Sequence, residues 1–346
     1  MSAQPSTLAG FERTARERLA PATWDYIAAV ADGGRTAANE RAALDAIQLR
    51  PRVLRRVEQV STAVELLGRT FELPVLAAPT AVQRMAHPDG ELAVLAACQA
   101  RGTLPIVSSA ASCTVAELER AGAPWWLQLY ALSDPGLADA LVERSIAAGA
   151  EAVVVTVDTP VIGRRAAVLP VPMQLLSSVL DDLGRDGASA AERLPMAPLD
   201  WNAIAALRER LTVPLLVKGV LHADDAARLA EMGVDGIVVS THGARQLDGS
   251  VGPARVVSGI VDAVAGRCPV LADGNVRSGL DVLRLLVRGA AAVLIGRPVL
   301  WGLASDGAAG VERVLDTLAD ELRSAMALAG CATTTAIDRG LEWRDA

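Results

Sequence analysis

Short apolar runs recur along the chain and alternate with longer segments whose apolar residues repeat at helical spacing. Each run is rich in Val, Ile, Leu and Ala and is bounded by Pro, Gly or polar residues, which is typical of a strand buried on both faces. The eight runs cover residues 74–78, 104–107, 125–129, 152–157, 214–217, 236–239, 269–272 and 291–295. Helical patterns lie between most of them, for example at residues 90–99, 114–120, 136–148 and 223–232.

This alternation predicts an α/β protein with a parallel sheet. Eight strand–helix units in 346 residues favour a closed (β/α)8 TIM barrel over an open doubly wound sheet, which remains the alternative. We expect a single domain over residues 1–346, in which residues 1–73 form an N-terminal helical cap with helices at 8–19 and 22–31 and a hairpin at 64–71. Residues 166–199 are too long for an ordinary loop and are expected to form a lid-like loop or a disordered segment.

Composition excludes several classes of protein. The chain is 51% hydrophobic and carries a net charge of -7, so we expect no nucleic-acid partner. It has no apolar run of the ~18 residues that a membrane helix needs, and its start lacks the order of a secretory signal, so we expect a cytoplasmic protein outside the membrane. Four cysteines, Cys98, Cys113, Cys268 and Cys331, lack metal-ligand spacing and are interpreted as reduced thiols, so no metal is expected.

Residues able to bind or react follow nearly every predicted strand. The carboxyl ends of the strands in a parallel barrel open on one face, where the active sites of this fold are built. In chain order these residues are Pro79-Thr80-Ala81, Ser108-Ser109, Gln128 with Tyr130, Thr156 with Asp158, Lys218, the segment from Ser240 to Arg245, Asp273-Gly274 and Gly296-Arg297. A packing role explains one or two polar strand ends but not eight, so we predict an active site at this face.

A phosphate site is expected after the last two strands. Gly274 and Gly296 let backbone N–H groups approach an anion, each following helix N-terminus adds positive potential, and Arg277 and Arg297 add charge. Barrels commonly hold a phosphate at this point, whereas neither a Walker A sequence nor a GxGxxG after a strand is present. The alternative is two ordinary glycine turns with surface arginines.

His242 is the candidate base, because it is one of three histidines and leaves a predicted strand. Asp158, at the end of another strand, is placed to hold the second ring nitrogen and raise the basicity of the imidazole. Arg165 and Arg245 provide planar cations suited to gripping a carboxylate. Lys218 ends an apolar strand and needs an anionic partner, which is either a cofactor or a carboxylate such as Asp158, unless the lysine forms a Schiff base.

Four remaining aromatic and histidine positions are less specific. Tyr26 in the cap and Tyr130 at a strand end are the only tyrosines, and either can be a packing residue. His87, in the loop after the first barrel strand, is expected to be structural, and His222 is expected to lie on the surface.

Ordered motifs along almost the whole chain resemble the FMN-dependent 2-hydroxy acid oxidase and dehydrogenase family. They are Trp24-Asp25-Tyr26, residues 49–53, 78–81, 86–91, Gln128-Leu129-Tyr130, residues 156–160, Gly163-Arg164-Arg165, Lys218-Gly219, residues 240–249, Gly296-Arg297-Pro298 and residues 326–330. Any one motif is weak evidence, but this number in this order is highly specific.

The resemblance implies that FMN binds at the barrel mouth, and it assigns a role to each site residue. FMN would be contacted by Pro79, Thr80, Ala81, Ser108, Gln128, Thr156, Lys218, Ser240, Asp273, Gly274, Arg277, Gly296 and Arg297. His242 would be the base and Asp158 its partner, with Tyr130 bonded to the reacting oxygen. Tyr26, Arg165 and Arg245 would hold the substrate carboxylate, while two electrons pass to the flavin.

The chain departs from the usual family motifs at several points. Thr241 replaces an Asn, and Asn275 replaces a Gly, which we expect to be tolerated because Asn adopts positive φ. The residues after Arg165 differ from the usual sequence, which puts the lid in question. Ala110 stands where glycolate oxidases have Trp and favours a bulkier, aromatic acid such as mandelate, and Ala81 favours an oxidase that reduces O2 to H2O2.

Other functions stay open at this point. The chain can be a dehydrogenase with another acceptor, a flavin-barrel isomerase or nitronate-type oxidase, or a tailoring oxidase of an unusual or carrier-bound substrate. The carboxylate clamp at Arg165 and Arg245 argues against the second, and the altered segment after Arg165 keeps the third open. A homo-oligomer, specifically a tetramer, is expected from the resemblance.

Overall fold

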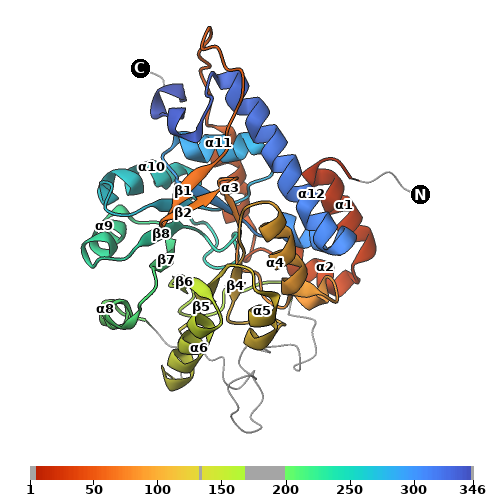
Figure 1. The fold of residues 1–346 in the computed structure, drawn as a ribbon, viewed down its shortest axis with the longest axis vertical. Helices are drawn as coiled ribbons and strands as arrows, with labels where there is room; N and C mark the ends of the chain where they lie inside the picture. The colour runs from red at the N-terminus through yellow and green to blue at the C-terminus, as the bar shows by residue number, and fades with distance from the viewer. Residues whose placement is uncertain (1–4, 132–134, 168–198, 344–346) are drawn as a thin grey trace.

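The computed structural model describes residues 5–131, 135–167 and 199–343. Eight parallel strands are ordered β3-β10-β9-β8-β7-β6-β5-β4, and each is followed by a helix. The strands are β3 (Val75–Ala77), β4 (Ile106–Ser108), β5 (Trp125–Leu129), β6 (Ala150–Thr156), β7 (Leu215–Val220), β8 (Gly236–Val239), β9 (Val270–Ala272) and β10 (Ala292–Ile295). The expected (β/α)8 barrel is confirmed, because the helices surround this ring of strands (Figure 1).

One seam of the barrel is joined differently from the others. Seven neighbouring strand pairs form parallel ladders, of which β5–β6 and β7–β8 each contain a register shift, whereas β3 and β4 meet at an isolated bridge between Ala77 and Pro105. The amide of Ala77 donates to the carbonyl of Leu104 across this seam at 3.2 Å. The ring is therefore closed, with its weakest backbone pairing between the first two barrel strands.

Apolar packing fills both sides of the barrel wall. The helices around the barrel are α4 (Gly90–Ala100), α5 (Val115–Ala121), α6 (Pro135–Ala147), α8 (Trp201–Arg210), α9 (Ala223–Glu231), α10 (Pro253–Val264), α11 (Gly279–Val287) and α12 (Arg297–Ala329). Their apolar faces cover the outer side of the strands, as expected when strand side chains point alternately inward and outward. The helix α12 is interrupted at Asp306 and Gly307, whose backbone angles are not helical.

A short hairpin closes the amino end of the barrel. The strands β1 (Val64–Leu66) and β2 (Arg69–Phe71) are joined by Leu67 and Gly68, which have φ of 51° and 78°. Positive φ at both central residues gives the turn that matches strand twist in a two-residue hairpin. Leu66 and Phe71 are buried in the barrel interior, where the Phe71 ring meets Trp126 edge-on at 6.4 Å. The expected hairpin at 64–71 is confirmed.

The N-terminal segment adds three helices, α1 (Leu8–Arg18), α2 (Pro21–Ala28) and α3 (Arg35–Asp45). Two of them match the expected helices, and α3 is an element that the sequence pattern did not reveal. In Figure 1, α1 and α2 lie beside α12. The larger part of the expected lid at 166–199 falls outside the described residues.

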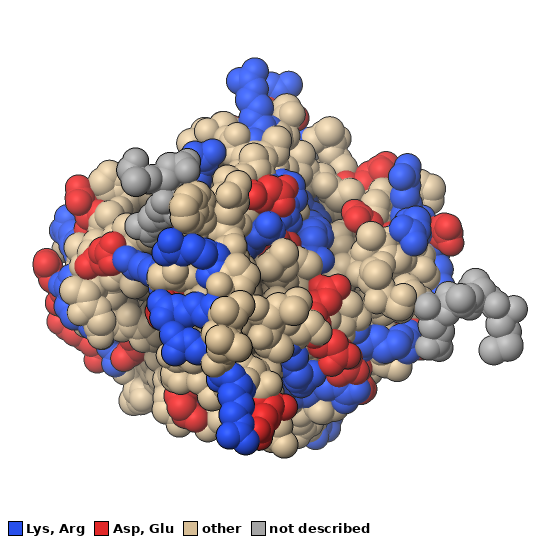
Figure 2. Space-filling model, turned by 90° about the horizontal axis from the view of Figure 1, so that it is seen from above, with Lys and Arg blue, Asp and Glu red and all other residues tan. Residues whose placement is uncertain are grey.

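No helix in the described part of the chain is both long and apolar enough to cross a bilayer. Figure 2 shows acidic and basic side chains interspersed over one face of the molecule. All four cysteines are free thiols, and three of them are buried.

Candidate active site

The carboxyl ends of the barrel strands surround a cavity of about 500 Å³. Fifteen predicted site residues line it directly: Tyr26, Pro79, Thr80, Ala81, Ala110, Tyr130, Arg165, Lys218, His242, Arg245, Asp273, Gly274, Arg277, Gly296 and Arg297. The other five, Ser108, Gln128, Thr156, Asp158 and Ser240, lie behind that lining and hydrogen-bond to one another or to lining residues. The fold therefore brings all the predicted residues to one place, from strands that are far apart in sequence.

A histidine–aspartate pair lies at one side of the cavity. His242 follows β8 with φ of 60°, and its Nδ1 lies 3.0 Å from Asp158 Oδ1. Burial alone would raise the pKa of Asp158, but the hydrogen bond and charge of His242, together with Lys218, lower it. An ionised carboxylate only accepts hydrogen bonds, so Nδ1 carries the proton and Nε2 presents a lone pair.

Tyr130 faces that lone pair. Its hydroxyl lies 3.3 Å from His242 Nε2, and the two rings are stacked at 20° with centroids 6.2 Å apart. Burial, followed by the charge of Asp158, raises the pKa of Tyr130 well above its usual value. The phenol is therefore protonated at neutral pH, and it can donate a hydrogen bond to an oxygen atom placed beside the imidazole.

Two arginines lie near this pair. Arg245 NH1 donates to the carbonyl oxygens of Tyr26 and Ala29 at 3.0 and 2.8 Å, and its guanidinium lies 4.9 Å from the centroid of the Tyr26 ring. Burial, together with the repulsion of Arg165, lowers the pKa of Arg245 to about 10, which still leaves it charged. No carboxylate within ion-pair distance of Arg245 occurs among the described residues. The cavity therefore holds an uncompensated positive charge, which favours an anionic ligand.

Three segments are joined around these cations. The amide of Ala31 donates to Ala244 O at 2.8 Å, and the cap pairs with the loop after β6 through the bridge between Ala31 and Arg165. The amide of Gly163 donates to Gln246 Oε1 at 2.7 Å. A Cβ on Gly163 would lie 2.4 Å from the carbonyl oxygen of Arg245, so glycine permits this close approach. Gln246 is a site residue that the sequence did not single out.

The floor of the cavity is a buried polar network. Lys218 Nζ donates to Ser240 Oγ at 2.7 Å and lies 3.2 Å from Asp273 Oδ2. The carboxylate partner of the lysine is therefore Asp273, and the alternative pairing with Asp158 is wrong because Asp158 turns to His242. β7 also continues through Gly219 to Val220, so Lys218 lies within the strand and does not end it.

A second group of buried side chains lies on the strands beside this floor. Gln128 accepts from Ser108 Oγ at 2.9 Å and donates to Thr156 Oγ1 at 3.0 Å. Each of these three side chains is buried and fixed by a neighbour on another strand. The network holds a rigid row of amide and hydroxyl groups below the cavity.

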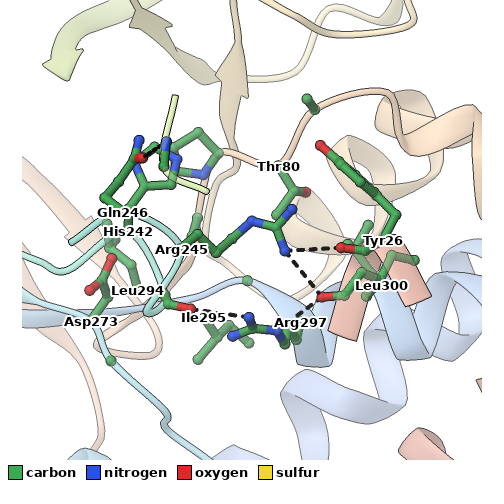
Figure 3. Close-up of a pocket in the computed structure, with 18 of the residues that line it drawn as sticks. Tyr26, Thr80, His242, Arg245, Gln246, Asp273, Leu294, Ile295, Arg297 and Leu300 are labelled. Carbon is green, nitrogen blue, oxygen red and sulfur yellow. Dashed lines mark hydrogen bonds between the residues drawn. The ribbon is translucent and has the colours of Figure 1, made fainter. Parts of the chain in front are cut away.

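A second pair of arginines, both partly buried, lines the cavity. Arg297 donates to the carbonyl oxygens of Ile27, Ala29 and Gly243 at 2.9–3.0 Å. Figure 3 shows Arg245 and Arg297 turned toward the same stretch of backbone carbonyls at the end of α2. Burial, followed by repulsion from Arg277, lowers the pKa of Arg297 to about 10.

Arg277 is the second member of the pair. Its guanidinium stacks 4.8 Å from the Trp301 ring and donates to Val276 O, and no ion pair to it occurs among the described residues. Two buried like charges side by side are costly unless an anion joins them. The N-terminus of α12 at Gly296 has no side-chain cap and can supply N–H donors. At the N-terminus of α11, the amide of Gly279 already donates to Glu321 and that of Asp281 to Ser278.

This geometry fits FMN. Gly274 lines the cavity with φ of 103°, and a Cβ at this position would meet Pro253 at 3.0 Å, so a residue with a side chain would be strained here. Asp273 Oδ1 is buried with no hydrogen-bond partner in the described structure, and a ribityl hydroxyl is a suitable donor to it. Asn275 has φ of 52°, which confirms that asparagine is tolerated where glycine is usual.

A (β/α)8 barrel with a histidine–aspartate pair and several arginines around one cavity at its mouth is the arrangement expected of an oxidoreductase of the flavin barrel class. The model of the family described as FMN-dependent dehydrogenase matches residues 15–344. The chain belongs to this family, and FMN is its cofactor.

Relatives and solved structures agree with this assignment. A 4-hydroxymandelate oxidase of Amycolatopsis orientalis is 39% identical over 96% of this chain and 97% of its own length. An L-lactate oxidase of a Nostoc species is 41% identical over 96% of this chain and 97% of its length. A crystal structure of mandelate oxidase has a TM-score of 0.90 at 39% identity and covers 96% of this chain and 97% of its own.

Proposed function

We propose that this protein is an FMN-dependent oxidase of (S)-2-hydroxy acids, with an aromatic, mandelate-like acid as substrate and O2 as the electron acceptor. The observation that carries the proposal is the joint placement of the His242–Asp158 pair and the cations Arg165 and Arg245 on one cavity. The base can act on a hydroxyl-bearing carbon while the cations hold the adjacent carboxylate.

The residues divide the reaction between them. Arg165, Arg245 and Tyr26 bind the substrate carboxylate, and Tyr130 donates a hydrogen bond to the 2-oxygen. His242 Nε2 accepts a proton from the substrate, and Asp158 stabilises the imidazolium that results. When bound, FMN accepts the two electrons that leave the substrate. The products are the 2-oxo acid and, after reduction of O2, hydrogen peroxide.

Different residues would bind the phosphate, the ribityl chain and the ring of FMN. Arg277, Arg297, Gly274 and Gly296 hold the phosphate, and Asp273 accepts from the ribityl chain. Lys218, which Ser240 holds in place, would stabilise negative charge on the reduced cofactor. Pro79, Thr80, Ala81, Ser108, Gln128 and Thr156 make the remaining contacts. Replacing Arg277 with Met should weaken FMN but not riboflavin, which lacks the phosphate, and equal affinities would place the phosphate elsewhere.

The proposal of an aromatic substrate rests on the apolar wall of the cavity. Ala110 lies at the wall with Met85 and Ile162, and its methyl group leaves room for a ring. The mandelate-oxidising relatives support the same choice, as does the crystal structure of mandelate oxidase with (S)-4-hydroxymandelic acid. Ala81 supports O2 as the acceptor.

A visible spectrum recorded with (S)-mandelate in the absence of oxygen tests the proposal. We expect the flavin to bleach and to return on admission of air, with peroxide formed. A bound flavin that resists mandelate, lactate and glycolate would favour an oxidase of an unusual or carrier-bound substrate. A flavin that bleaches and does not return in air would favour a dehydrogenase.

Substitution of Ala110 by Trp tests the substrate pocket. The indole should fill the space for the aromatic ring and raise KM for mandelate by at least about tenfold while changing KM for glycolate little. The FMN content of the variant serves as its control. An equal rise in KM for both acids would contradict an aromatic-ring site at this wall.

We also propose a cytoplasmic homo-tetramer. The support is the family resemblance and the four free thiols, which suit a reducing compartment. Light scattering of the purified protein tests the assembly, and a mass of one chain or two would contradict it.

A further inference from the structure

Glu40 is a buried carboxyl group for which the reaction has no use. It lies on α3, its side chain is 1% exposed, and it hydrogen-bonds to the hydroxyl of Thr241. A Cβ built on Gly274 would lie 3.4 Å from Glu40 Oε1, so the carboxyl also adjoins the phosphate loop. Glu40 therefore contacts the loops after β8 and β9 at the same time.

Further bonds fix α3 against this loop. Asn275 Nδ2 donates to Ala37 O at 3.2 Å, and Arg41 NH1 donates to Asn275 O at 3.3 Å. Arg41 also forms two hydrogen bonds to Asp281, at 2.7 and 2.9 Å. The helix α3, which carries Glu40, therefore cannot move away from the phosphate loop without breaking these contacts.

The charges around Glu40 come from several elements. Those that face it are Glu12 on α1, Asp273 and Arg277 after β9, and Arg297 at the start of α12. A small cavity of about 130 Å³ lies between Glu40, Glu12 and the two arginines. Burial raises the pKa of Glu40 to about 7, the hydrogen bond from Thr241 opposes this rise, Asp273 adds to it, and the two arginines oppose it.

A phosphate bound at Arg277 and Arg297 changes this balance. It neutralises the two cations that favour the Glu40 carboxylate and places further negative charge beside it. Both effects favour the protonated acid. We propose that Glu40 is an additional residue of the FMN site and takes up a proton from solvent when the FMN phosphate binds. This inference rests on the phosphate position given in the proposed function.

The proposal predicts a specific pH dependence of FMN affinity. Below about pH 6, Glu40 is protonated with or without FMN and has no effect. As pH rises through its pKa of about 7, the free protein loses a proton that FMN binding must restore. The affinity then falls by up to about tenfold per pH unit because binding and protonation are linked.

Titration of the full-length apoprotein with FMN, followed by flavin fluorescence from pH 5.5 to 8.5, tests this dependence in the wild type and in Glu40→Gln. The second ionisation of the FMN phosphate near pH 6 affects both proteins equally, so the ratio of their Kd values isolates Glu40. We expect Kd of the wild type relative to the variant to rise at least about tenfold over this range. A ratio that stays flat would overturn the proposal.

Two controls make the test specific. Riboflavin lacks the phosphate, so the ratio of its Kd for the wild type to its Kd for Glu40→Gln should not vary with pH. Asp45→Asn removes one negative charge from the same helix at an exposed position and should give the wild-type pH profile. A pH-dependent ratio for riboflavin, or a profile for Asp45→Asn like that of Glu40→Gln, would overturn a role of Glu40 toward the phosphate.

Calorimetry on the wild type tests proton uptake by Glu40 even if Glu40→Gln does not fold. FMN binding at pH 7.5 in two phosphate-free buffers of different ionisation enthalpy should take up more than about half a proton per site, and riboflavin should take up none. No uptake with FMN would overturn the proposal. If Arg277→Met weakens FMN and the uptake is absent, the phosphate site stands and only the role of Glu40 fails.

Discussion

A histidine acts as a base only if its surroundings leave one ring nitrogen free and stabilise the charged ring. At His242 both conditions depend on Asp158, which binds Nδ1 at 3.0 Å and is kept ionised by the imidazole and Lys218. Tyr130 and the two cations then define where a substrate lies relative to the free nitrogen. These side chains follow three strands: Tyr130 follows β5, Asp158 and Arg165 follow β6, and His242 and Arg245 follow β8.

Replacement of Asp158 by Asn should lower kcat by about 10² to 10⁴, because an amide cannot stabilise the imidazolium. KM for the acid should change much less, since Asp158 does not face the carboxylate site. Steady-state kinetics measures both, with FMN content as a check on folding. Asp89→Asn, at an exposed position beside His87, is the matched control, and a kcat equal to wild type in Asp158→Asn would contradict the role.

At this scale the sequence pointed to side chains that the fold gathers around one cavity. Charged and polar side chains at the ends of apolar strands are conspicuous, and the barrel brings them together. Glu40 was not predicted, because nothing local marks it: its burial results from Thr241 and Gly274, which lie about two hundred residues later. Thr241 and Asn275 both differ from the residues usual in the family, and both contact α3.

At the scale of elements, the site depends on how the loops and the cap are joined. The cap supplies the carbonyls that hold Arg245 and Arg297, and the loop after β6 is fastened to the loop after β8. The last carbonyl groups of a helix have no partner within the helix. The two arginines donate hydrogen bonds to those of α2, and these bonds also fix the orientation of the arginine side chains.

Gly163→Ala tests the fastening of these loops. A methyl group would meet the carbonyl oxygen of Arg245 at 2.4 Å, so the loop that carries Arg165 must shift. We expect KM to rise by about 10- to 100-fold with FMN affinity unchanged, because a displacement of about 1 Å is costly for substrate alignment.

The matched control for this variant is Gly259→Ala. Gly259 lies in α10 with no atom within 4 Å of the added Cβ, so its kinetics should equal those of the wild type. Unchanged KM in Gly163→Ala would show that Arg165 is held independently of this contact.

The strands were predicted to within two or three residues, since continuous apolar runs are a local signal. The helix α3 was missed for a physical reason. It begins after Gly34 without a side-chain cap of its own, and the amide of Thr36 is capped by Asp248 at 2.8 Å. Because the capping residue lies so far away in the sequence, no capping signal is present near the start of the helix.

At the scale of the whole molecule, the two ends of the barrel have separate tasks. The carboxyl ends of the strands hold the chemistry, while the hairpin β1–β2 seals the amino ends with Leu66 and Phe71. Substitutions at the carboxyl ends of the strands should therefore affect activity, whereas substitutions at the amino ends should affect stability.

Phe71→Ala should lower the free energy of unfolding by about 3–5 kcal/mol, since it leaves a void against Trp126. The kcat/KM of the folded protein should stay within about twofold of wild type because the plug is remote from the cavity. Urea denaturation and kinetics check the two parts. Leu54→Ala, at a fully exposed position, is the control for stability, and a loss of activity without a loss of stability would contradict the division.

The order of the elements favoured the closed barrel over an open sheet, and the structure confirms the barrel. The segment at 166–199 could not be predicted in the same way, because it lacks a regular apolar period and the residues after Arg165 differ from the usual pattern. Its larger part lies outside the described residues. The assembly of chains likewise depends on surface complementarity, which no local pattern encodes.

The single bridge between Ala77 and Pro105 makes the β3–β4 seam the place where the barrel opens most readily. Amide protons there should exchange with deuterated solvent sooner than those of the regular ladders. Thr80 and Ala81 follow the strand on one side of the seam, and Ser108 ends the strand on the other side. A flavin ring that contacted all three residues would bridge the seam, so we expect amide exchange there to be slower with FMN bound than without it.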